Sequence, residues 1–574
     1  MSLLIKTTNL TKPQALVPVF DKASAAANSF VSSLSPDLKQ RFYELRSPLT
    51  VSNNFKQPLA ITPSTTFPFA VRQSMPATRS GIPLTPWSLA MPVMPRGKTV
   101  VSMTSNMMTL NPPGSSFVGN QKDLTKTLGE LGGFKNSAEI KQKNNINSIM
   151  GVEDPVGFIN RGEIEQKGIL NFQLGIGSKF GIVNFGQIKS TGSSIVVGYG
   201  LAFGVFNAGS VKLSGENSRI IGGGVLNGIW NVGELQTSNK SDIVAGISGG
   251  VGIANGFVLD PALYPNILPK TLKVLQATAA ASEINTKEGD DLIYGGGLYN
   301  VNEFLSKLPN IPEFTSQFLA DILLTNPNSK DASIGILNFG KINTGLGNDV
   351  VFGAGDDLTA PENMAFLSAA GIGSIGSGII NAKTGVINLG YGDDLMVGET
   401  WAVNPPNGGE SPRAGIVNYG LINTGDGNDH ICGFSGTTAP ANKGIFNDGT
   451  IITGIGNDFI DALTGGFSGT GLTDLGLGDD TLVGFGSGRF DGGSGPKDKL
   501  LLADGSYAFA GFGRLGNEPD AAGYFKLTKG SDTMLIKNFE LIGSAADPIN
   551  AIQFNLGSVY NISGNSIISA PLLF

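Results

Sequence analysis

The chain contains almost none of the residues on which disulfide-bonded proteins and many hydrolases depend. Its 574 residues include one cysteine, Cys432, and one histidine, His430. A single cysteine excludes a disulfide framework, so an exported protein of this composition must be held together by something else, and a metal is the obvious substitute. The sequence GISGG around Ser248 matches a nucleophile elbow, but its triad would need His430, and no HExxH zinc motif exists. We therefore expect no enzyme activity.

Long apolar runs and dense charge are also missing. No segment offers about 18 uninterrupted apolar residues, and the apolar run near the amino terminus is too short for the core of a cleaved signal peptide. No membrane span is therefore expected. Charged residues make up only 15% of the chain, and the basic ones are dispersed without interleaved aromatics. That pattern argues against nucleic acid as a partner.

The charge that is present divides the chain near residue 150. Residues 1–150 hold 16 Lys and Arg against 6 Asp and Glu, a net charge of +10, which leaves −17 for the remainder. Only 7 of the 82 glycines precede residue 151, and 14 of the 30 prolines do. We interpret residues 1–150 as a basic, mostly irregular arm with short helices at 20–46 and 121–143. Such an arm is suited to dock on the acidic part of a neighbouring copy or on anionic cell-surface polysaccharide.

A hexapeptide repeat begins at residue 157. GFINRG, GIVNFG, GVFNAG, GIWNVG and the shortened GIANG follow one another at spacings of 24, 23, 24 and 24 residues, and related sequences return from residue 335 onward. A fixed period of this length indicates a solenoid, and the alternation within each unit is that of a strand. About three strands per coil predict an all-β, right-handed parallel β-helix. Its repeated asparagines are expected to stack as a hydrogen-bonded ladder, at Asn160, Asn184, Asn207, Asn231, Asn255, Asn338, Asn381, Asn418 and Asn447.

The repeat is interrupted at residues 257–281 and 298–332. LYNVNEFLSK and PEFTSQFLADILL have helical spacing there, so we expect helical loops that project from the solenoid. The coils accordingly divide into residues 151–256, a coil with insertions at 257–334, and residues 335–499. Residues 500–574 read as a β-cap that covers the last coil.

A second motif follows the hexapeptide in the later coils. Six decapeptides such as GKINTGLGND and GLINTGDGND align without a gap, and they end at Asp291, Asp349, Asp394, Asp429, Asp458 and Asp480. Two glycines one residue apart allow a backbone turn closed to other residues, and aspartate adds a hard, charged oxygen. Carboxylates stacked at about 5 Å would repel each other by roughly 3 kcal/mol at an effective dielectric of 20. A Ca²⁺ ion between adjacent turns would reverse the sign of that interaction.

These turns resemble the GGxGxDxUx nonapeptide of the haemolysin-type calcium-binding repeat (RTX) family. The six copies are separated by 22 to 58 residues instead of following directly. In that family the aspartate and the carbonyls of the Gly-x-Gly turn bind the ion. The resemblance implies as metal ligands Asp291, Gly345, Gly347, Asp349, Asp357, Asp394, Gly425, Gly427, Asp429, Gly454, Gly456, Asp458, Gly476, Gly478 and Asp480, with Asp498 a weaker candidate. Asp242 keeps the acid without the glycines, so the coils of 151–256 are expected to hold together without metal.

The resemblance also implies an export route and a role. RTX proteins leave the cell by a type I apparatus that reads an uncleaved carboxyl-terminal signal, and residues 500–574 look like such a flank and tail. The chain is similar to RTX-repeat surface proteins of cyanobacteria, which form external layers, sheaths or fibrils linked to adhesion and gliding. We therefore expect a secreted structural protein that self-associates into filaments or layers. The alternative is a secreted polysaccharide lyase or epimerase built on the β-helix, with its site on the insertions between 257 and 332.

His430 and Cys432 lie inside one of these turns and occupy variable positions of the motif. The equivalents of position 430 are Leu292, Val350, Leu395, Phe459 and Thr481. We therefore expect both side chains to flank an inward Ile431 without any metal chemistry of their own.

Overall fold

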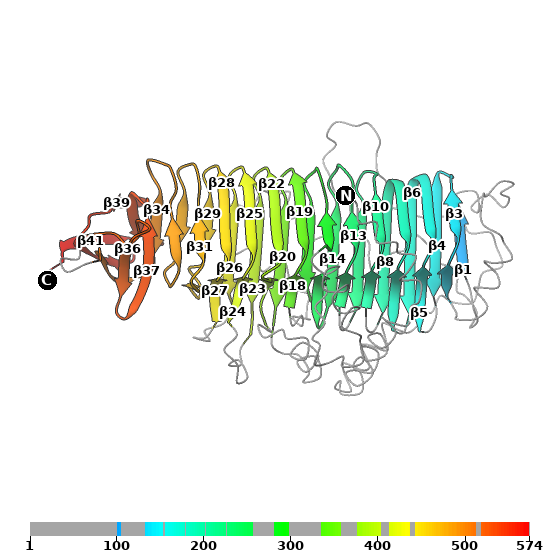
Figure 1. The fold of residues 1–574 in the computed structure, drawn as a ribbon, viewed down its shortest axis with the longest axis horizontal. Coiled ribbons are helices and arrows are strands. Elements are labelled where there is room, and N and C mark those ends of the chain that lie inside the picture. The colour runs from blue at the N-terminus through cyan, green and yellow to red at the C-terminus, as the bar shows by residue number, and fades with distance from the viewer. Residues whose placement is uncertain are drawn as a thin grey trace.

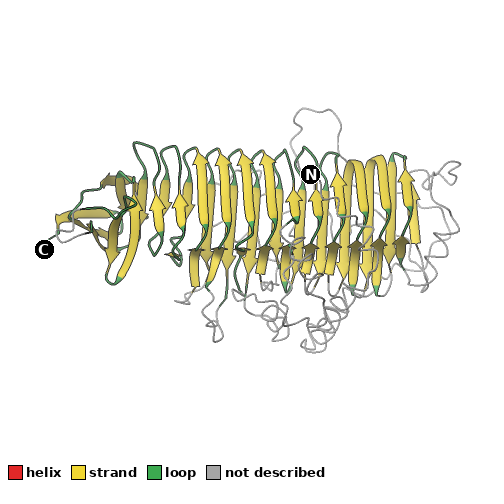
Figure 2. Ribbon diagram, viewed as in Figure 1, coloured by secondary structure: helices red, strands yellow, loops and turns green. Residues whose placement is uncertain are grey.

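A computed structural model describes residues 100–104, 133–152, 155–177, 179–200, 203–224, 227–256, 281–297, 334–356, 376–402, 412–436, 442–512 and 518–572. Within these ranges the chain forms strands and no α-helix, as Figures 1 and 2 show. No helix there is long and apolar enough to cross a membrane. The predicted all-β parallel solenoid is confirmed. The helices predicted at 20–46 and within 298–332 lie outside the described residues.

Most coils contribute to three faces that run along the molecule, and the last coils contribute to only two of them (Figure 1). The first face consists of β3 (Glu139–Gln142), β6 (Glu163–Gly177), β8 (Gln187–Gly200), β10 (Ser210–Leu213), β13 (Glu234–Gln236), β16 (Glu283–Asn285), β19 (Lys341–Leu346), β22 (Val386–Tyr391), β25 (Leu421–Asp426), β28 (Thr450–Ile455), β31 (Leu472–Asp474), β33 (Arg489–Asp491) and β37 (Asp532–Lys537). The second face consists of β4 (Ile146–Val152), the ends of β6 and β8, β11 (Arg219–Gly224), β14 (Ile243–Ser248), β17 (Leu292–Gly296), β20 (Val350–Gly355), β23 (Leu395–Thr400), β26 (His430–Ser435), β29 (Phe459–Asp461), β32 (Thr481–Val483), β34 (Lys499–Leu502) and β38 (Leu541–Ser544).

The third face is a separate, 11-stranded sheet built from the hexapeptide repeat. It consists of β2 (Phe134–Asn136), β5 (Val156–Asn160), β7 (Phe180–Asn184), β9 (Phe203–Asn207), β12 (Asn227–Asn231), β15 (Val251–Asn255), β18 (Ile334–Asn338), β21 (Ile379–Asn381), β24 (Arg413–Asn418), β27 (Asn442–Asn447) and β30 (Phe467–Ser468). The other two faces join into one sheet because β6 and β8 are long enough to bend through both. Neighbouring coils pair in parallel with equivalent residues in register, for example Asn207 beside Asn231.

The solenoid begins earlier than the boundary predicted near residue 150. β2 and β3 pair in parallel with β5 and β6, so residues 134–142 already form a coil. The short helix predicted over 121–143 is therefore wrong for its described part. The segment forms strands because buried and more exposed positions alternate in FKN and EIKQ, which is the period of a half-buried strand. Phe134, Ile140 and the amides Asn136 and Gln142 are buried, whereas Lys135, Glu139 and Lys141 are more exposed.

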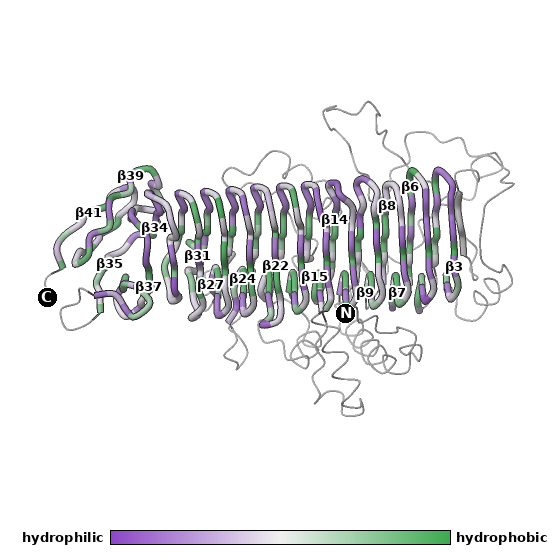
Figure 3. Tube along the Cα trace, turned by 45° about the horizontal axis from the view of Figure 1, so that its top comes forward, coloured by the Kyte–Doolittle hydropathy of each residue, from purple (hydrophilic) through white to green (hydrophobic). Residues whose placement is uncertain are grey.

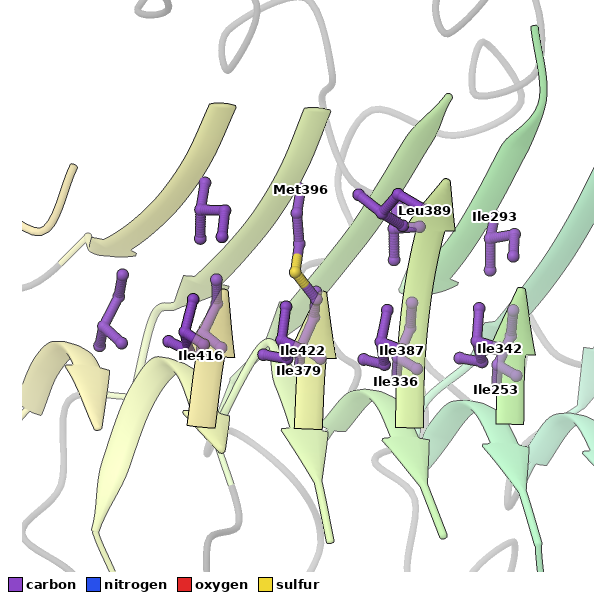
Figure 4. Close-up of a cluster of buried hydrophobic side chains, with 14 of the residues drawn as sticks. Ile253, Ile293, Ile336, Ile342, Ile379, Ile387, Leu389, Met396, Ile416 and Ile422 are labelled. Atoms are coloured by element: carbon purple, nitrogen blue, oxygen red, sulfur yellow. The ribbon is translucent and has the colours of Figure 1, made fainter. Parts of the chain in front are cut away.

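The core is a column of stacked aliphatic side chains between the three faces. Figure 4 shows isoleucines of successive coils side by side in rows along the solenoid, together with Leu389 of β22 and Met396 of β23. The outward side of the third face is apolar too, and Phe206, Trp230 and Val417 on it are buried. Its strands therefore read as nearly continuous apolar runs, as expected for parallel strands buried on both sides. Along a whole coil, apolar stretches alternate with polar ones, as Figure 3 shows.

The asparagine ladder is confirmed and is one residue longer than predicted. Each buried amide donates from Nδ2 to Oδ1 of its equivalent in the next coil, at 2.7 to 2.9 Å, from Asn136 through Asn160, Asn184, Asn207, Asn231, Asn255, Asn338, Asn381 and Asn418 to Asn447. The same amide group also donates to a backbone carbonyl; for example, Nδ2 of Asn231 donates to the carbonyl oxygen of Glu283. The ladder satisfies the polar groups at the corner between the third and first faces.

Antiparallel strands close the carboxyl-terminal end, as expected for a cap. The last coils shorten, because equivalent aspartates are 22 residues apart at Asp458 and Asp480 but 18 apart at Asp480 and Asp498. The cap then adds β35 (Gly505–Ala510), β36 (Phe525–Lys529), β39 (Asp547–Gln553), β40 (Ser558–Ser563) and β41 (Ser566–Pro571) in antiparallel pairs. At the opposite end, β1 (Val100–Thr104) lies antiparallel to β4.

Candidate metal centre

The predicted glycine–aspartate turns form the corner between the first and second faces. They stack in register, with Gly390 beside Gly425 and Gly425 beside Gly454. Gly425 and Gly427 have φ angles of 111° and 144°, which residues with a Cβ rarely adopt. A Cβ on Gly427 would lie 1.8 Å from the carbonyl oxygen of Gly392 in the preceding coil. The same left-handed backbone and the same crowding apply to Gly345, Gly347, Gly454, Gly456, Gly476 and Gly478.

The first turn departs from this rule. Lys287 occupies the position of the first glycine, and its φ of 73° makes it one of the few residues with a Cβ in the left-handed region. The second position remains glycine, Gly289. The turn therefore tolerates one strained side chain at its beginning, next to coils that lack the motif.

The aspartates that end the turns lie side by side along the corner and are buried. Each Oδ1 accepts the backbone N–H of the equivalent aspartate in the preceding coil, at 2.7 to 2.9 Å. The row runs from Asp242 through Asp291, Asp349, Asp394, Asp429, Asp458 and Asp480 to Asp498. The structure thus brings together all predicted aspartates except Asp357, which lies outside the described residues.

The second oxygen of these carboxyl groups has no partner from Asp291 onward. Oδ2 is buried without a hydrogen bond in Asp291, Asp349, Asp394, Asp429, Asp458, Asp480 and Asp498. Buried polar atoms are normally satisfied, and each exception calls for an explanation, such as an ion. Seven equivalent exceptions in one row point to one shared cause.

Burial in this row raises the pKa of its aspartates. Desolvation is the main cause, followed for Asp291 by the like charge of Asp349, and together they raise the pKa of Asp291 to about 9. Burial likewise raises the pKa of Asp394 to about 9 and that of Asp349 to about 7. The folded chain therefore disfavours these carboxylates in their charged form unless a cation compensates them.

Asp242 supplies an internal comparison at the start of the row. Its Oδ1 accepts the N–H of Ser218 at 2.5 Å, and its Oδ2 accepts both the N–H and the hydroxyl of Ser238, at 2.6 and 2.7 Å. This carboxylate is fully hydrogen-bonded by the protein alone. The change from Asp242 to Asp291 coincides with the first turn that carries the second glycine of the motif, Gly289.

Sequence reasoning missed the end of the row. The backbone N–H of Asp498 donates to Oε2 of Glu540 at 2.9 Å, so a glutamate from the cap continues the ladder. Glu540 follows β37, outside any repeat, so no sequence signal could have identified it. Asp498, the weaker candidate, occupies the same position as the other members and lacks a partner for Oδ2 as they do.

A second, exposed row runs beside the buried one. In the turns from Asp291 to Asp480, the residue before the buried aspartate forms this row. Five of its side chains accept the backbone N–H of the equivalent residue in the following coil, whereas in the buried row the N–H comes from the preceding coil. The members of the exposed row are Asp290, Asn348, Asp393, Asn428, Asn457 and Asp479. The two adjacent residues of each GND or GDD sequence thus bind the two neighbouring coils, one on each side.

His430 and Cys432 lie in β26 on either side of Ile431, which is in the core. The imidazole ring packs against Phe459 of the next coil with ring centroids 5.3 Å apart. Burial raises the pKa of the Cys432 thiol to about 12, so it is an inert thiol. Nowhere in the described ranges do three or more His, Cys, Asp or Glu side chains converge on one point. Any cation in the row would therefore depend on carboxylates of neighbouring coils together with backbone carbonyls.

Searches of family models, of curated proteins and of solved structures each returned no significant match to this chain.

Proposed function

We propose that the chain is a calcium-stabilised β-solenoid whose carboxylate row binds Ca²⁺ between coils. The observation that carries the proposal is the series of seven buried Oδ2 atoms without a partner. The residues fit the ion, because Ca²⁺ takes six to eight hard oxygen ligands in flexible geometry, and the corner offers carboxylate and backbone oxygens. When bound, the ion supplies a positive charge that compensates the row.

Asp242 favours an ion over a purely structural role for the row. Where the turn lacks the paired glycines, Ser238 and Ser218 satisfy the carboxylate. In the later turns the position of Ser238 is taken by Lys287 or by a glycine such as Gly345, so its two hydrogen bonds to Oδ2 are lost. Threonine hydroxyls do lie beside these carboxyl groups, at Thr286, Thr344, Thr424 and Thr453, but they donate to backbone carbonyls and leave Oδ2 without a donor. In a turn that only packs tightly, a buried oxygen without a hydrogen bond costs stability and brings no gain. An oxygen that binds a metal must have no protein donor on it.

The proposed biological role is structural and extracellular. Metal-dependent folding favours a compartment rich in calcium, and coils that each contact only their neighbours give a long, stiff body. Such a body is suited to an external layer, sheath or fibril, assembled by self-association or on anionic cell-surface polysaccharide. Secretion by a type I route belongs to the same proposal and rests on the RTX resemblance alone.

The calcium proposal is tested by unfolding the full-length protein in calcium, in magnesium and in excess chelator. One ion held at a hundred times its dissociation constant adds about 2.7 kcal/mol, so several ions should raise the unfolding midpoint by many degrees. Magnesium is the matched control, because it demands a tighter octahedral geometry. Equal midpoints in calcium and chelator would sink the proposal.

The structural role is tested by electron microscopy of the calcium-loaded protein. Filaments or sheets are expected. Monomers alone, together with cleavage of an added polysaccharide, would favour the alternative of a lyase or epimerase. Its predicted location, the insertions between 257 and 332, lies almost wholly outside the described residues.

A further inference from the structure

The corner that holds the carboxylate row also carries a line of exposed apolar side chains. The residue between the two left-handed positions of each turn points outward, because the backbone folds around it; both positions are glycines except in the first turn, where Lys287 takes the first one. Along the stack these residues are Glu288, Leu346, Tyr391, Asp426, Ile455, Leu477 and Ser494, paired coil to coil in that order. We call this line the turn ridge.

The apolar members of the turn ridge are unusually accessible. Leu346 is 46% exposed, Tyr391 58%, and Ile455 and Leu477 51% each. At about 4.8 Å per coil the ridge is roughly 30 Å long. Most large apolar side chains of the described coils are buried, so four such residues on one line mark an interaction surface.

The flank of the turn ridge is acidic. The exposed row beside it contributes Asp290, Asp393 and Asp479, and the ridge itself contributes Glu288 and Asp426. Lys287 and Lys497 are the basic residues within these turns, and Lys497 lies 4.0 Å from Asp479. Two ridges facing each other would oppose like charges. The surface therefore fits an occupant that is basic and apolar.

We infer that the turn ridge is the docking surface for the amino-terminal segment, residues 1–99, of a second copy of this chain. That segment holds 11 Lys and Arg against 3 Asp and Glu and is rich in Phe, Leu, Val and Met. It precedes β1, which lies at the amino-terminal end of the solenoid. About nine extended residues span the ridge, so a small part of the segment is enough. This inference rests on the proposed self-association and names its contact.

The test is a photo-crosslink in the full-length, calcium-loaded protein. Tyr391→p-benzoylphenylalanine places the reactive group on the ridge, and an equal mixture of ¹⁵N-labelled and unlabelled chains identifies contacts between copies. Adducts of mixed isotope that join position 391 to peptides from residues 1–99 are expected. The same substitution at Ile568, an exposed apolar residue of the cap, is the control and should give no such adduct. Ridge-to-ridge adducts, same-chain adducts alone, or adducts elsewhere would overturn the inference.

A second measurement uses matched variants. Leu346→Ser, Tyr391→Ser, Ile455→Ser and Leu477→Ser together should weaken association by at least about tenfold. The control removes four exposed apolar side chains off the ridge, Leu463→Ser, Ile549→Ser, Leu556→Ser and Ile568→Ser, and should leave association unchanged. If the ridge variant assembles like the wild type, the inference fails while the proposed function stands. If the wild type stays monomeric at every calcium concentration, the inference and the proposed self-association both fail, while the calcium proposal keeps its own test.

Discussion

Asp429→Asn should change stability in opposite directions with and without calcium. Asp429 is buried between Asp394 and Asp458, accepts the N–H of Asp394 at 2.9 Å, and donates its own N–H to Asp458 at 2.8 Å. Asparagine has nearly the same shape, and its Oδ1 can still accept the first hydrogen bond. The substitution therefore removes charge from the row without removing its backbone contacts.

The magnitude follows from the spacing of the coils. Each neighbouring carboxylate at about 5 Å repels Asp429 by roughly 3 kcal/mol at an effective dielectric of 20. Burial raises the pKa of the neighbouring Asp394 to about 9, so partial protonation of that carboxyl group relieves part of this repulsion. In chelator at pH 8 we therefore expect Asp429→Asn to stabilise the chain by about 1 to 2 kcal/mol. In calcium the variant loses a charged ligand, and one lost ion costs about 3 kcal/mol.

The assay is urea unfolding followed by far-ultraviolet circular dichroism, in chelator and in millimolar calcium. Calorimetric titration counts the ions bound by each form. His430→Leu is the matched control, because it changes the next residue and should leave both the calcium count and the stability difference unaltered. A variant that is destabilised equally in both buffers, or that binds as many ions as the wild type, would refute the reasoning.

Three further outcomes are expected. In chelator, the free energy of unfolding should fall as pH rises from about 4 to 9. The pKa is raised to about 9 in Asp291 and Asp394 and to about 6 or 7 in Asp458 and Asp480, so the folded chain binds more protons than the unfolded chain in that window. A rise in urea midpoints over the same range would contradict this. Gly427→Ala should lower the free energy of unfolding by at least about 3 kcal/mol, because its Cβ would meet the carbonyl oxygen of Gly392. Gly530 also has a positive φ but faces open space, so Gly530→Ala should cost only about 1 kcal/mol in the same urea assay. Asn231→Ala should cost about 3 to 5 kcal/mol, since it leaves ladder partners unsatisfied on both sides; thermal unfolding that matches the wild type would show that the ladder contributes nothing.

The sequence by itself determined the repeat and everything that follows from a repeat. The hexapeptide spacing predicted three strands per coil, because 24 residues leave room for no more, and the recurrent asparagine predicted its ladder, because equivalent residues must stack in register. The decapeptides likewise predicted which aspartates lie together. Such inferences succeed because each coil contacts only its neighbours, so distance along the chain translates directly into distance in space.

The sequence was less informative where a residue has no equivalent in the next coil. The strands at 134–142 precede the first recognisable hexapeptide, and their place in the solenoid is decided by pairing with β5 and β6. Glu540 joins the carboxylate row only because the cap returns the chain to the last coil. Periodicity cannot report a contact that occurs once.

Only the tertiary structure decided which oxygen of each aspartate is engaged. The sequence predicted a stack of carboxylates, whereas the structure gives one oxygen of each to a backbone N–H and leaves the other buried without a partner. It likewise separated Asp242, satisfied by Ser218 and Ser238, from Asp291 and its successors. Both distinctions depend on side-chain directions at a corner shared by two coils. Those directions are fixed by contacts between the stacked coils, so the sequence alone does not give them.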